Sequence, residues 1–261
     1  MTPSRSNYDK ARDATAAVFL RYDQAAMIRK FGLSHDADAL YITFIARDYR
    51  VDRRTGAVTW ASDTAHTASY NEAMSIYDVL CDSQPLCHLS HEWVNVASLC
   101  SIQGGTLSKD GDFFKNSCAR FSGDAAALDR ACRALGGIPQ PKGDVAYQLP
   151  LFPFLPLILR FWEADEDFPA SMQVLVDKNT LNFLHYETLM FALSHLMTRL
   201  QDELRTESVR SQAREQFTGA VDRIFDTAES VCIASVARAV LRAVRDSVVS
   251  VARAVWNWIF F

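Results

Sequence analysis

The sequence predicts an α+β fold in which an antiparallel sheet packs with helices, followed by a C-terminal amphipathic helical extension. Three observations support this prediction. Strand-like and helix-like segments are interspersed without a strict β–α–β rhythm. The 261-residue chain is 49% hydrophobic, which suffices for a core. The character of the sequence also changes near residue 206. We therefore expect one domain over residues 7–205 and a helical tail over residues 206–261.

Helices and short strands alternate in the first half of the domain. Residues 7–31 carry apolar side chains at three- and four-residue spacing, which predicts a helix. Three segments rich in β-branched and aromatic residues predict a meander of antiparallel strands: 40–45, 49–51 and 57–60. Residues 70–80 return to a helical period, and residues 81–123 predict loops with short helices.

The second half of the domain predicts a sheet followed by a long helix. Asp124 is a good N-cap for a helix that should end near Leu135, before two glycines. Three strands are expected after this helix, at 146–149, 157–161 and 172–176. The last two flank the acidic turn Glu163–Asp167 and should form a hairpin. Residues 185–204 predict a leucine-rich helix.

The tail differs from the domain in composition and in pattern. No proline occurs after Pro169, and the segment Ser235–Val240 recurs as Ser250–Val255. On a helical wheel the arginines of residues 231–261 gather on one side, and the opposite side is largely apolar. Three interpretations stay open for this helix: packing on the domain, self-association or a partner groove, and contact with a membrane interface.

Composition and targeting signals exclude several classes of protein. A net charge of −4 gives no basic excess, so no nucleic-acid partner is expected. The N-terminus lacks the apolar core of a signal peptide. The longest uncharged apolar stretch, residues 145–159, contains three prolines and falls short of the ~20 residues that span a bilayer. We expect a cytoplasmic protein with reduced cysteines. Its tail could also hold the protein at the membrane periphery.

Four phrases in the chain carry a family resemblance. In order they are Asn71–Cys81, Leu135–Gly137 with Gly143-Asp144, Phe161–Pro169 and Val176–Thr188. Together they resemble an uncharacterised prokaryotic family, domain-of-unknown-function family 3786, over about residues 7–205. Members of that family stand alone or follow a small four-cysteine iron–sulfur domain of the kind seen in corrinoid proteins. The resemblance implies a link to corrinoid or low-potential redox metabolism, but no activity and no catalytic residue.

The acidic turn is the first candidate site. Several carboxylates between two strands could bind a divalent cation or a basic group, because hard cations require several oxygen ligands. The candidate ligand-binding residues are Trp162, Glu163, Asp165, Glu166, Asp167 and Asp144. The alternative is a solvated hairpin end, with Trp162 and Phe168 packed beneath it.

The start of the last domain helix is the second candidate site. His185, Tyr186 and Glu187 can all carry protons, and a junction between a loop and a helix displays side chains well. These three are the catalytic candidates. Glu187 in the first turn also suits the helix dipole, which is its structural explanation.

Cys81, Cys87, His88 and His91 form the weakest candidate, a metal site. Thiolates and imidazoles are good zinc ligands, and the four residues fall within eleven positions. Their spacing matches no standard zinc pattern, so we expect no stoichiometric zinc.

Two functions remain open. The chain has no nucleotide-binding glycine loop and no nucleophile elbow, which favours a ligand- or cofactor-binding accessory protein with a small-molecule partner and an unknown cofactor. The alternative is an enzyme with an acid/base site around His185, Tyr186 and the Glu163–Asp167 turn. A pocket that is mostly apolar would favour binding, whereas convergence of these residues on one cleft would favour catalysis.

Overall fold

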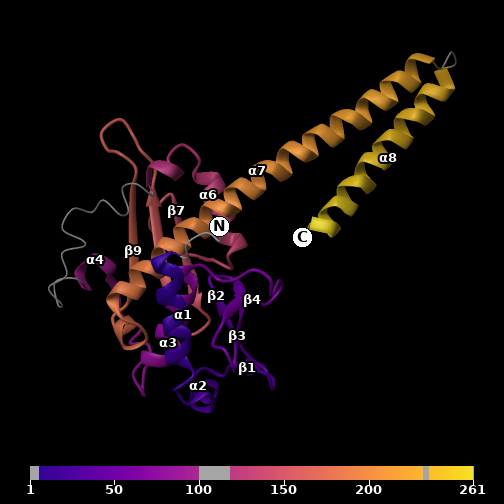
Figure 1. The fold of residues 1–261 in the computed structure, drawn as a ribbon. Helices are drawn as coiled ribbons and strands as arrows, with labels where there is room; N and C mark the ends of the chain where they lie inside the picture. The colour runs from indigo at the N-terminus through magenta and orange to yellow at the C-terminus, as the bar shows by residue number, and fades with distance from the viewer. Residues whose placement is uncertain (1–5, 100–117, 232–234, 261) are drawn as a thin grey trace. The chain divides into compact units, whose positions relative to one another are not determined.

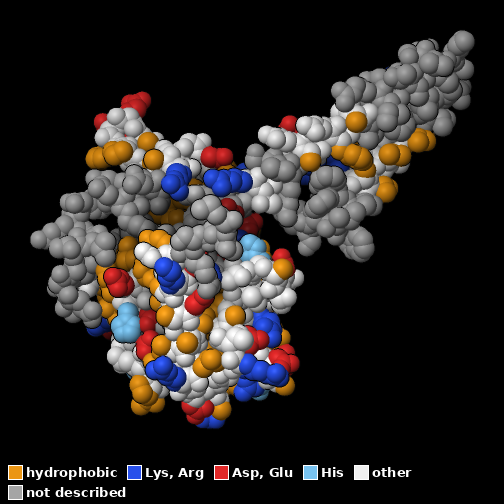
Figure 2. All heavy atoms as spheres, viewed as in Figure 1, with side chains coloured by type: hydrophobic (Ala, Val, Ile, Leu, Met, Phe, Trp, Pro, Cys, Tyr) orange, Lys and Arg blue, Asp and Glu red, His pale blue; other side chains and the backbone are white. Residues whose placement is uncertain are grey.

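The computed structural model describes residues 6–99, 118–231 and 235–260. The chain divides into two compact units, Met1–Leu204 and Arg205–Phe261. The first unit contains helices and two antiparallel sheets, which confirms the α+β class (Figure 1). On the face shown in Figure 2, basic and acidic side chains are interspersed over this unit.

The first sheet is the predicted meander. Its four antiparallel strands follow the order of the chain: β1 (Ser34–His35), β2 (Ala39–Phe44), β3 (Arg47–Asp52) and β4 (Val58–Trp60). Ile45 and Ala46 connect β2 to β3 with φ values of 46° and 53°. Two successive positive φ values match the right-handed twist of the flanking strands. Ile45 is buried and donates its backbone N–H to Leu151, which ties this turn to the second sheet.

The second sheet has the order β5-β9-β8-β7-β6. Its strands are β5 (Trp93–Asn95), β6 (Ile138–Pro139), β7 (Val145–Phe152), β8 (Leu155–Trp162) and β9 (Ser171–Asp177). Strands β8 and β9 pair as the predicted antiparallel hairpin, with Leu157 opposite Val176. Strand β7 runs further than predicted and includes Pro150, where the register with β8 shifts.

The helices of the described residues are α1 (Asn7–Phe19), α2 (Gln24–Phe31), α3 (Tyr70–Asp82), α4 (Val96–Leu99), α6 (Ala125–Ala134), α7 (Tyr186–Val231) and α8 (Ser235–Phe260). A short 3-10 helix, Thr180–Asn182, precedes α7. Helices α1 and α3 lie side by side (Figure 1).

The prediction of one helix over residues 7–31 was wrong. The chain leaves α1 after Phe19 and begins α2 with Asp23 as the N-cap, whose side chain accepts a hydrogen bond from the N–H of Ala26. A capping aspartate competes with helix continuation because it satisfies the free N–H groups of a new first turn. The break still leaves Phe19 and Met27 buried.

The core of the first unit lies where the two sheets meet α3 and the start of α7. Phe44 of the first sheet stacks on Phe152 of the second, with ring centroids 4.9 Å apart. Tyr77 of α3 packs against Phe19 and donates its hydroxyl to the carbonyl of Gly56, 2.7 Å away. Leu200 is the last buried apolar residue among those whose side chains the structure describes.

The second unit is helical where it is described, which confirms the helical extension. It comprises the end of α7 and helix α8. The side chains of Val244, Val248 and Val251 on α8 are exposed. Among the described residues, no helix combines the length and the hydropathy needed to cross a membrane.

Candidate functional site

Carboxylates of the acidic turn Glu163–Asp167 accept hydrogen bonds from backbone N–H groups. Asp165 accepts hydrogen bonds from the backbone N–H groups of Asp167 and Phe168, at 2.9 and 2.7 Å. Glu163 accepts one from the N–H of Gly123 at 2.9 Å, and Asp144 accepts one from the N–H of Glu163 at 2.8 Å. Three of the predicted ligand-binding carboxylates therefore fasten the turn and its neighbours instead of converging on one point.

The remaining residues of the turn face solvent. Glu166 and Asp167 are exposed, and no hydrogen bond reaches their carboxylates from the described residues. Trp162 is half-buried at the end of β8. Phe168 is 70% exposed, so the expectation that it packs beneath the turn was wrong.

The four weak metal candidates lie on two different elements. Cys81 is on α3, whereas Cys87, His88 and His91 belong to the loop that follows. Within the described residues these four do not bring three donor atoms together. Burial, followed by nearby carboxylates of α3, raises the pKa of the Cys81 thiol to about 12. The backbone N–H of His91 is held by Asp177 at 2.7 Å.

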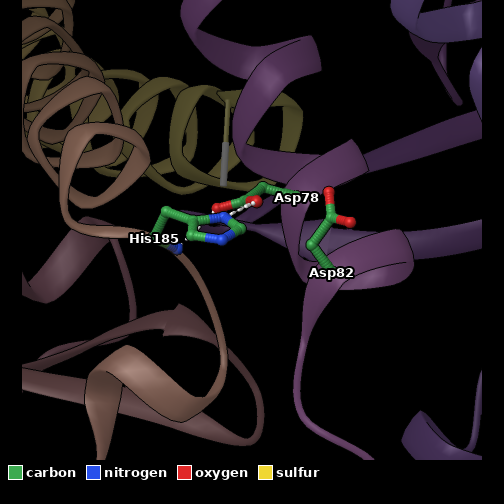
Figure 3. A group of neighbouring side chains, drawn as sticks. All are labelled: Asp78, Asp82 and His185. Carbon is green, nitrogen blue, oxygen red and sulfur yellow. Dashed lines mark hydrogen bonds and ion pairs between the residues drawn. The ribbon is translucent and has the colours of Figure 1, made fainter.

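His185 instead meets a carboxylate that the sequence analysis did not single out. It lies just before α7, and its Nδ1 is 2.6 Å from Oδ1 of Asp78 on α3 (Figure 3). Its backbone N–H donates to the other oxygen of Asp78, at 2.7 Å. Asp78 is buried, but the His185 side chain is 69% exposed. The hydrogen bond with Asp78 raises the pKa of His185 and fixes the orientation of its imidazole.

Asp82 lies one helical turn beyond Asp78, beside the same imidazole (Figure 3). Its carboxylate accepts a hydrogen bond from the hydroxyl of Tyr22 at 2.9 Å. One donor atom from each of Asp78, Asp82 and His185 lies within 4.8 Å of the others. By donor chemistry this group suits a divalent cation or proton transfer at the exposed imidazole.

The structure does not form the predicted acid/base site that combined His185, Tyr186 and the acidic turn. The turn precedes Ser171 at one end of β9, whereas His185 follows Asp177 at the other end. A strand of this length separates its ends by roughly 20 Å. Tyr186 is half-buried and packs against the core.

Glu187 lines a pocket of its own, formed by the start of α1, the start of α3 and the first turns of α7. The pocket is open, with a volume of about 730 Å³. Its lining residues are Tyr8, Ser69, Tyr70, Asn71, Glu187, Met190, Phe191 and Ser194. We call this the α1–α3–α7 pocket. The ring of Tyr70 makes edge contacts with Tyr8 and with Phe191, at centroid distances of 5.1 and 5.4 Å.

A buried carboxylate fixes the α3 side of this pocket. Glu72 closes a capping box with Ser69, accepting its N–H at 2.6 Å, and also accepts the hydroxyl of Tyr49 at 2.5 Å. Arg47 and the indole N–H of Trp60 reach the same carboxylate at 3.3 Å. Burial alone would raise the pKa of Glu72, but the hydrogen bonds from Tyr49 and Ser69 outweigh it and lower the pKa to about 2.

His195 lies beside this network without joining it. Its ring stacks on Phe44 at 5.5 Å, and its Nε2 is 3.5 Å from a carboxylate oxygen of Glu72. Burial lowers the pKa of His195 to about 4, so the imidazole is neutral at physiological pH. Among the described residues, no hydrogen bond reaches Nε2.

Sequence reasoning missed Asp78, Glu72 and Tyr70. One signal was available: Ser69 and Glu72 have the spacing of a capping box, which marks the start of a helix and fixes its first turn. The partners of Asp78 and Glu72 are distant in sequence, so no local sequence pattern predicts these contacts.

Three curated relatives from Escherichia coli (strain K12) match parts of the chain. The putative uncharacterized protein YeeP is 73% identical over 100 residues, 38% of this chain and 37% of YeeP. The uncharacterized proteins YfjP and YkfA are 44% and 43% identical over 70 residues, each match covering 26% of this chain and 24% of the relative. The chain thus spans less than two fifths of the length of these relatives.

No solved structure matches the chain significantly. Residues 23–199, more than half of the chain, match the family described as a domain of unknown function, DUF3786. This range includes the Asp78–His185 pair and every lining residue of the α1–α3–α7 pocket except Tyr8. The chain therefore belongs to the DUF3786 family.

Proposed function

We propose that the first unit is a ligand-binding domain and that the α1–α3–α7 pocket is its binding site. The observation that carries the proposal is an open pocket of about 730 Å³, whose described lining combines three aromatic rings and a methionine with four polar or charged side chains. Pockets for small molecules have this size and composition. An accessory role in corrinoid or low-potential redox metabolism depends on the family resemblance alone, because no pocket residue is specific for such a ligand.

The pocket is built on fixed elements and still offers free polar groups. The capping box holds the first turn of α3, and Tyr70 is held between two aromatic rings. Among the described residues, no hydrogen bond reaches the side chains of Asn71, Glu187 or Ser194. A ligand can therefore pair with these groups without breaking protein contacts, which lowers the cost of binding.

Filling the pocket tests the proposal. Replacing Ser194 with Trp adds a large ring inside the pocket, whereas the same change at the exposed Thr198, one turn further along α7, leaves the pocket empty. We expect a ligand-observed NMR screen to find small molecules that bind the full-length protein and the Thr198→Trp variant but not Ser194→Trp. Retention of every ligand by Ser194→Trp would place the binding elsewhere and overturn the proposal.

A second candidate function is acid–base catalysis at the Asp78–His185 pair. The specific observation is the 2.6 Å contact between a buried carboxylate and a largely exposed imidazole, which leaves the other ring nitrogen available to a substrate. A panel of chromogenic ester and phosphate substrates would test it, comparing the parent protein with His185→Gln and with the control Glu166→Gln, which changes an exposed side chain of the acidic turn. Turnover that His185→Gln abolishes and Glu166→Gln retains would support it, and equal turnover in all three proteins would exclude it.

A further inference from the structure

The charge and the aromatic character of the α1–α3–α7 pocket point to a class of ligand. We propose that the pocket binds an organic cation, an alkylated ammonium group with a short polar arm. This inference rests on the proposed function of the pocket and adds the chemistry of its ligand.

Glu187 is the only formally charged side chain among the eight described lining residues. It is exposed, and no ion pair or hydrogen bond reaches it from the described part of the chain. A carboxylate without a cationic partner at the edge of an apolar pocket attracts a positive ligand and disfavours a negative one. None of the described lining residues is a Lys or Arg that could balance the charge of an anion.

Three aromatic rings supply the second element of recognition. Tyr8 and Phe191 both contact Tyr70 through edge arrangements, with interplanar angles of 64° and 72°. Rings that meet edge to face present differently oriented surfaces to the space they line. An aromatic face carries negative partial charge and attracts a cation, with or without N–H groups to donate. Methylated ammonium groups also bury apolar surface against such rings.

Two helix N-termini border the pocket, and by themselves they would favour an anion. Both are already met by carboxylates. Glu72 is in the first turn of α3, accepts the N–H of Ser69 and is ionised at neutral pH. Glu187 is in the first turn of α7. Arg47 pairs with Glu72, whereas the full negative charge of Glu187 exceeds the partial positive charge at the start of α7, so the pocket favours a cation.

The remaining polar groups define the rest of the ligand. Asn71 and Ser194 both line the pocket, and no hydrogen bond reaches their side chains from the described residues. An amide and a hydroxyl can pair with a hydroxyl or carbonyl oxygen on the ligand. The inferred ligand therefore combines a compact cation with one neutral polar group.

The test uses two probes of the same shape. Choline and 3,3-dimethylbutan-1-ol differ only in a charged nitrogen against a neutral carbon. In calorimetric or NMR titrations of the full-length protein at low salt, we expect choline to bind about tenfold more tightly. The Glu187→Gln variant should weaken choline binding roughly fivefold and leave the neutral alcohol nearly unchanged. Glu166→Gln, which removes an exposed charge from the acidic turn, is the matched control and should change neither affinity.

The outcomes distinguish the preference for a cation from the more general proposal that the pocket binds a ligand. Equal affinities for the two probes, both blocked by Ser194→Trp, would retain the ligand-binding pocket and overturn the preference for a cation. Binding of screened neutral or anionic molecules without binding of choline would do the same. If no molecule binds in a manner that Ser194→Trp blocks, both proposals fail. A choline preference that Glu187→Gln leaves intact would also overturn the inference.

Discussion

Two histidines, one just before α7 and one on it, lie beside carboxylates of α3. Because they differ in burial, their pKa values shift in opposite directions. His185 is 69% exposed and bonded to Asp78, which raises the pKa of its imidazole. The side chain of His195 is only 9% exposed, and the loss of solvent lowers its pKa to about 4 although Glu72 lies 3.5 Å away. Desolvation dominates for His195, whereas the hydrogen bond with Asp78 dominates for His185. Of the two, therefore, only His185 is suited to carry a proton near neutral pH.

Replacing Asp78 with Asn should lower the pKa of His185 toward the ordinary value of about 6.5. A pKa raised in the folded state means that protonated His185 stabilises the fold. This contribution is complete below the unfolded pKa and is lost as the pH rises through the folded pKa. The stability gap between the parent protein and Asp78→Asn should therefore be larger at about pH 5.5 than at about pH 8.5.

NMR titration of the imidazole and urea unfolding at the two pH values check this prediction. Asp82→Asn is the control, because Asp82 adds only a weaker charge interaction and has no hydrogen bond to His185. We expect it to lower the pKa by less. A pKa of His185 that does not change in Asp78→Asn would contradict the assignment.

Replacing Glu72 with Gln should destabilise the protein by about 2–4 kcal/mol at neutral pH, because Arg47 and Tyr49 lose a buried ionised acceptor. The folded pKa of Glu72 is lowered to about 2, so its stabilising effect is complete above the unfolded value of about 4.3 and is lost as the pH falls toward 2. Denaturant unfolding at about pH 7 and about pH 3 should show that Glu72→Gln lowers the free energy of unfolding by less at the acidic pH. Glu166→Gln is the control, and an equal penalty at both pH values would count against the network.

At the scale of elements, strands and caps could be predicted from the sequence where local chemistry decides them. The meander and the β8–β9 hairpin follow from β-branched runs bounded by turns, and Asp124 caps α6 as expected. The break before α2 was missed because the helical spacing of apolar residues continues across it. Periodicity alone does not register a competing cap.

The candidate site could be predicted only in part. Asp78 and His185 are 107 residues apart, and nothing local relates a polar position on one helix to the start of another. The separation of His185 from Glu187, in contrast, could have been inferred. On the helix predicted over residues 185–204, two positions that are two residues apart differ by about 200° around the axis, so their side chains should face nearly opposite sides. Glu187 accordingly lines the pocket, whereas His185 meets Asp78.

The docking of α1 on the turn before β4 gives a prediction at this scale. Gly56 has a φ of 75°, and a Cβ at this position would lie 2.4 Å from the backbone oxygen of Ala16. Gly56→Ala should cost more than about 3 kcal/mol, because strain and a backbone clash add. Gly32 has a φ of 61° but open space around it, so Gly32→Ala should cost only about 1 kcal/mol. Equal costs in denaturant unfolding would show that α1 moves away at little expense.

At the scale of the whole molecule, the core and the family match end close together. Among the side chains that the structure describes, the last buried apolar one is Leu200; the family match ends at residue 199, and the first unit ends at Leu204. Helix α7 nevertheless continues to Val231. The residues after Leu204 thus extend the helix, and none of their described side chains belongs to the core of the first unit.

We predict that a chain ending at Arg205 folds and that residues 206–261 mediate association with another chain or with an anionic membrane surface. The truncated chain keeps every buried apolar side chain of the described core, so its unfolding midpoint should stay close to that of the full chain. It loses the exposed Val244, Val248 and Val251, which recur at helical spacing on α8, together with the tail arginines. Covering the exposed apolar face of a basic helix, by another chain or by a membrane surface, lowers the free energy of the system. Size exclusion and co-sedimentation with anionic vesicles should therefore distinguish the two proteins. Unfolding of the truncated chain would refute its independence, and identical behaviour in both assays would refute the role of the tail.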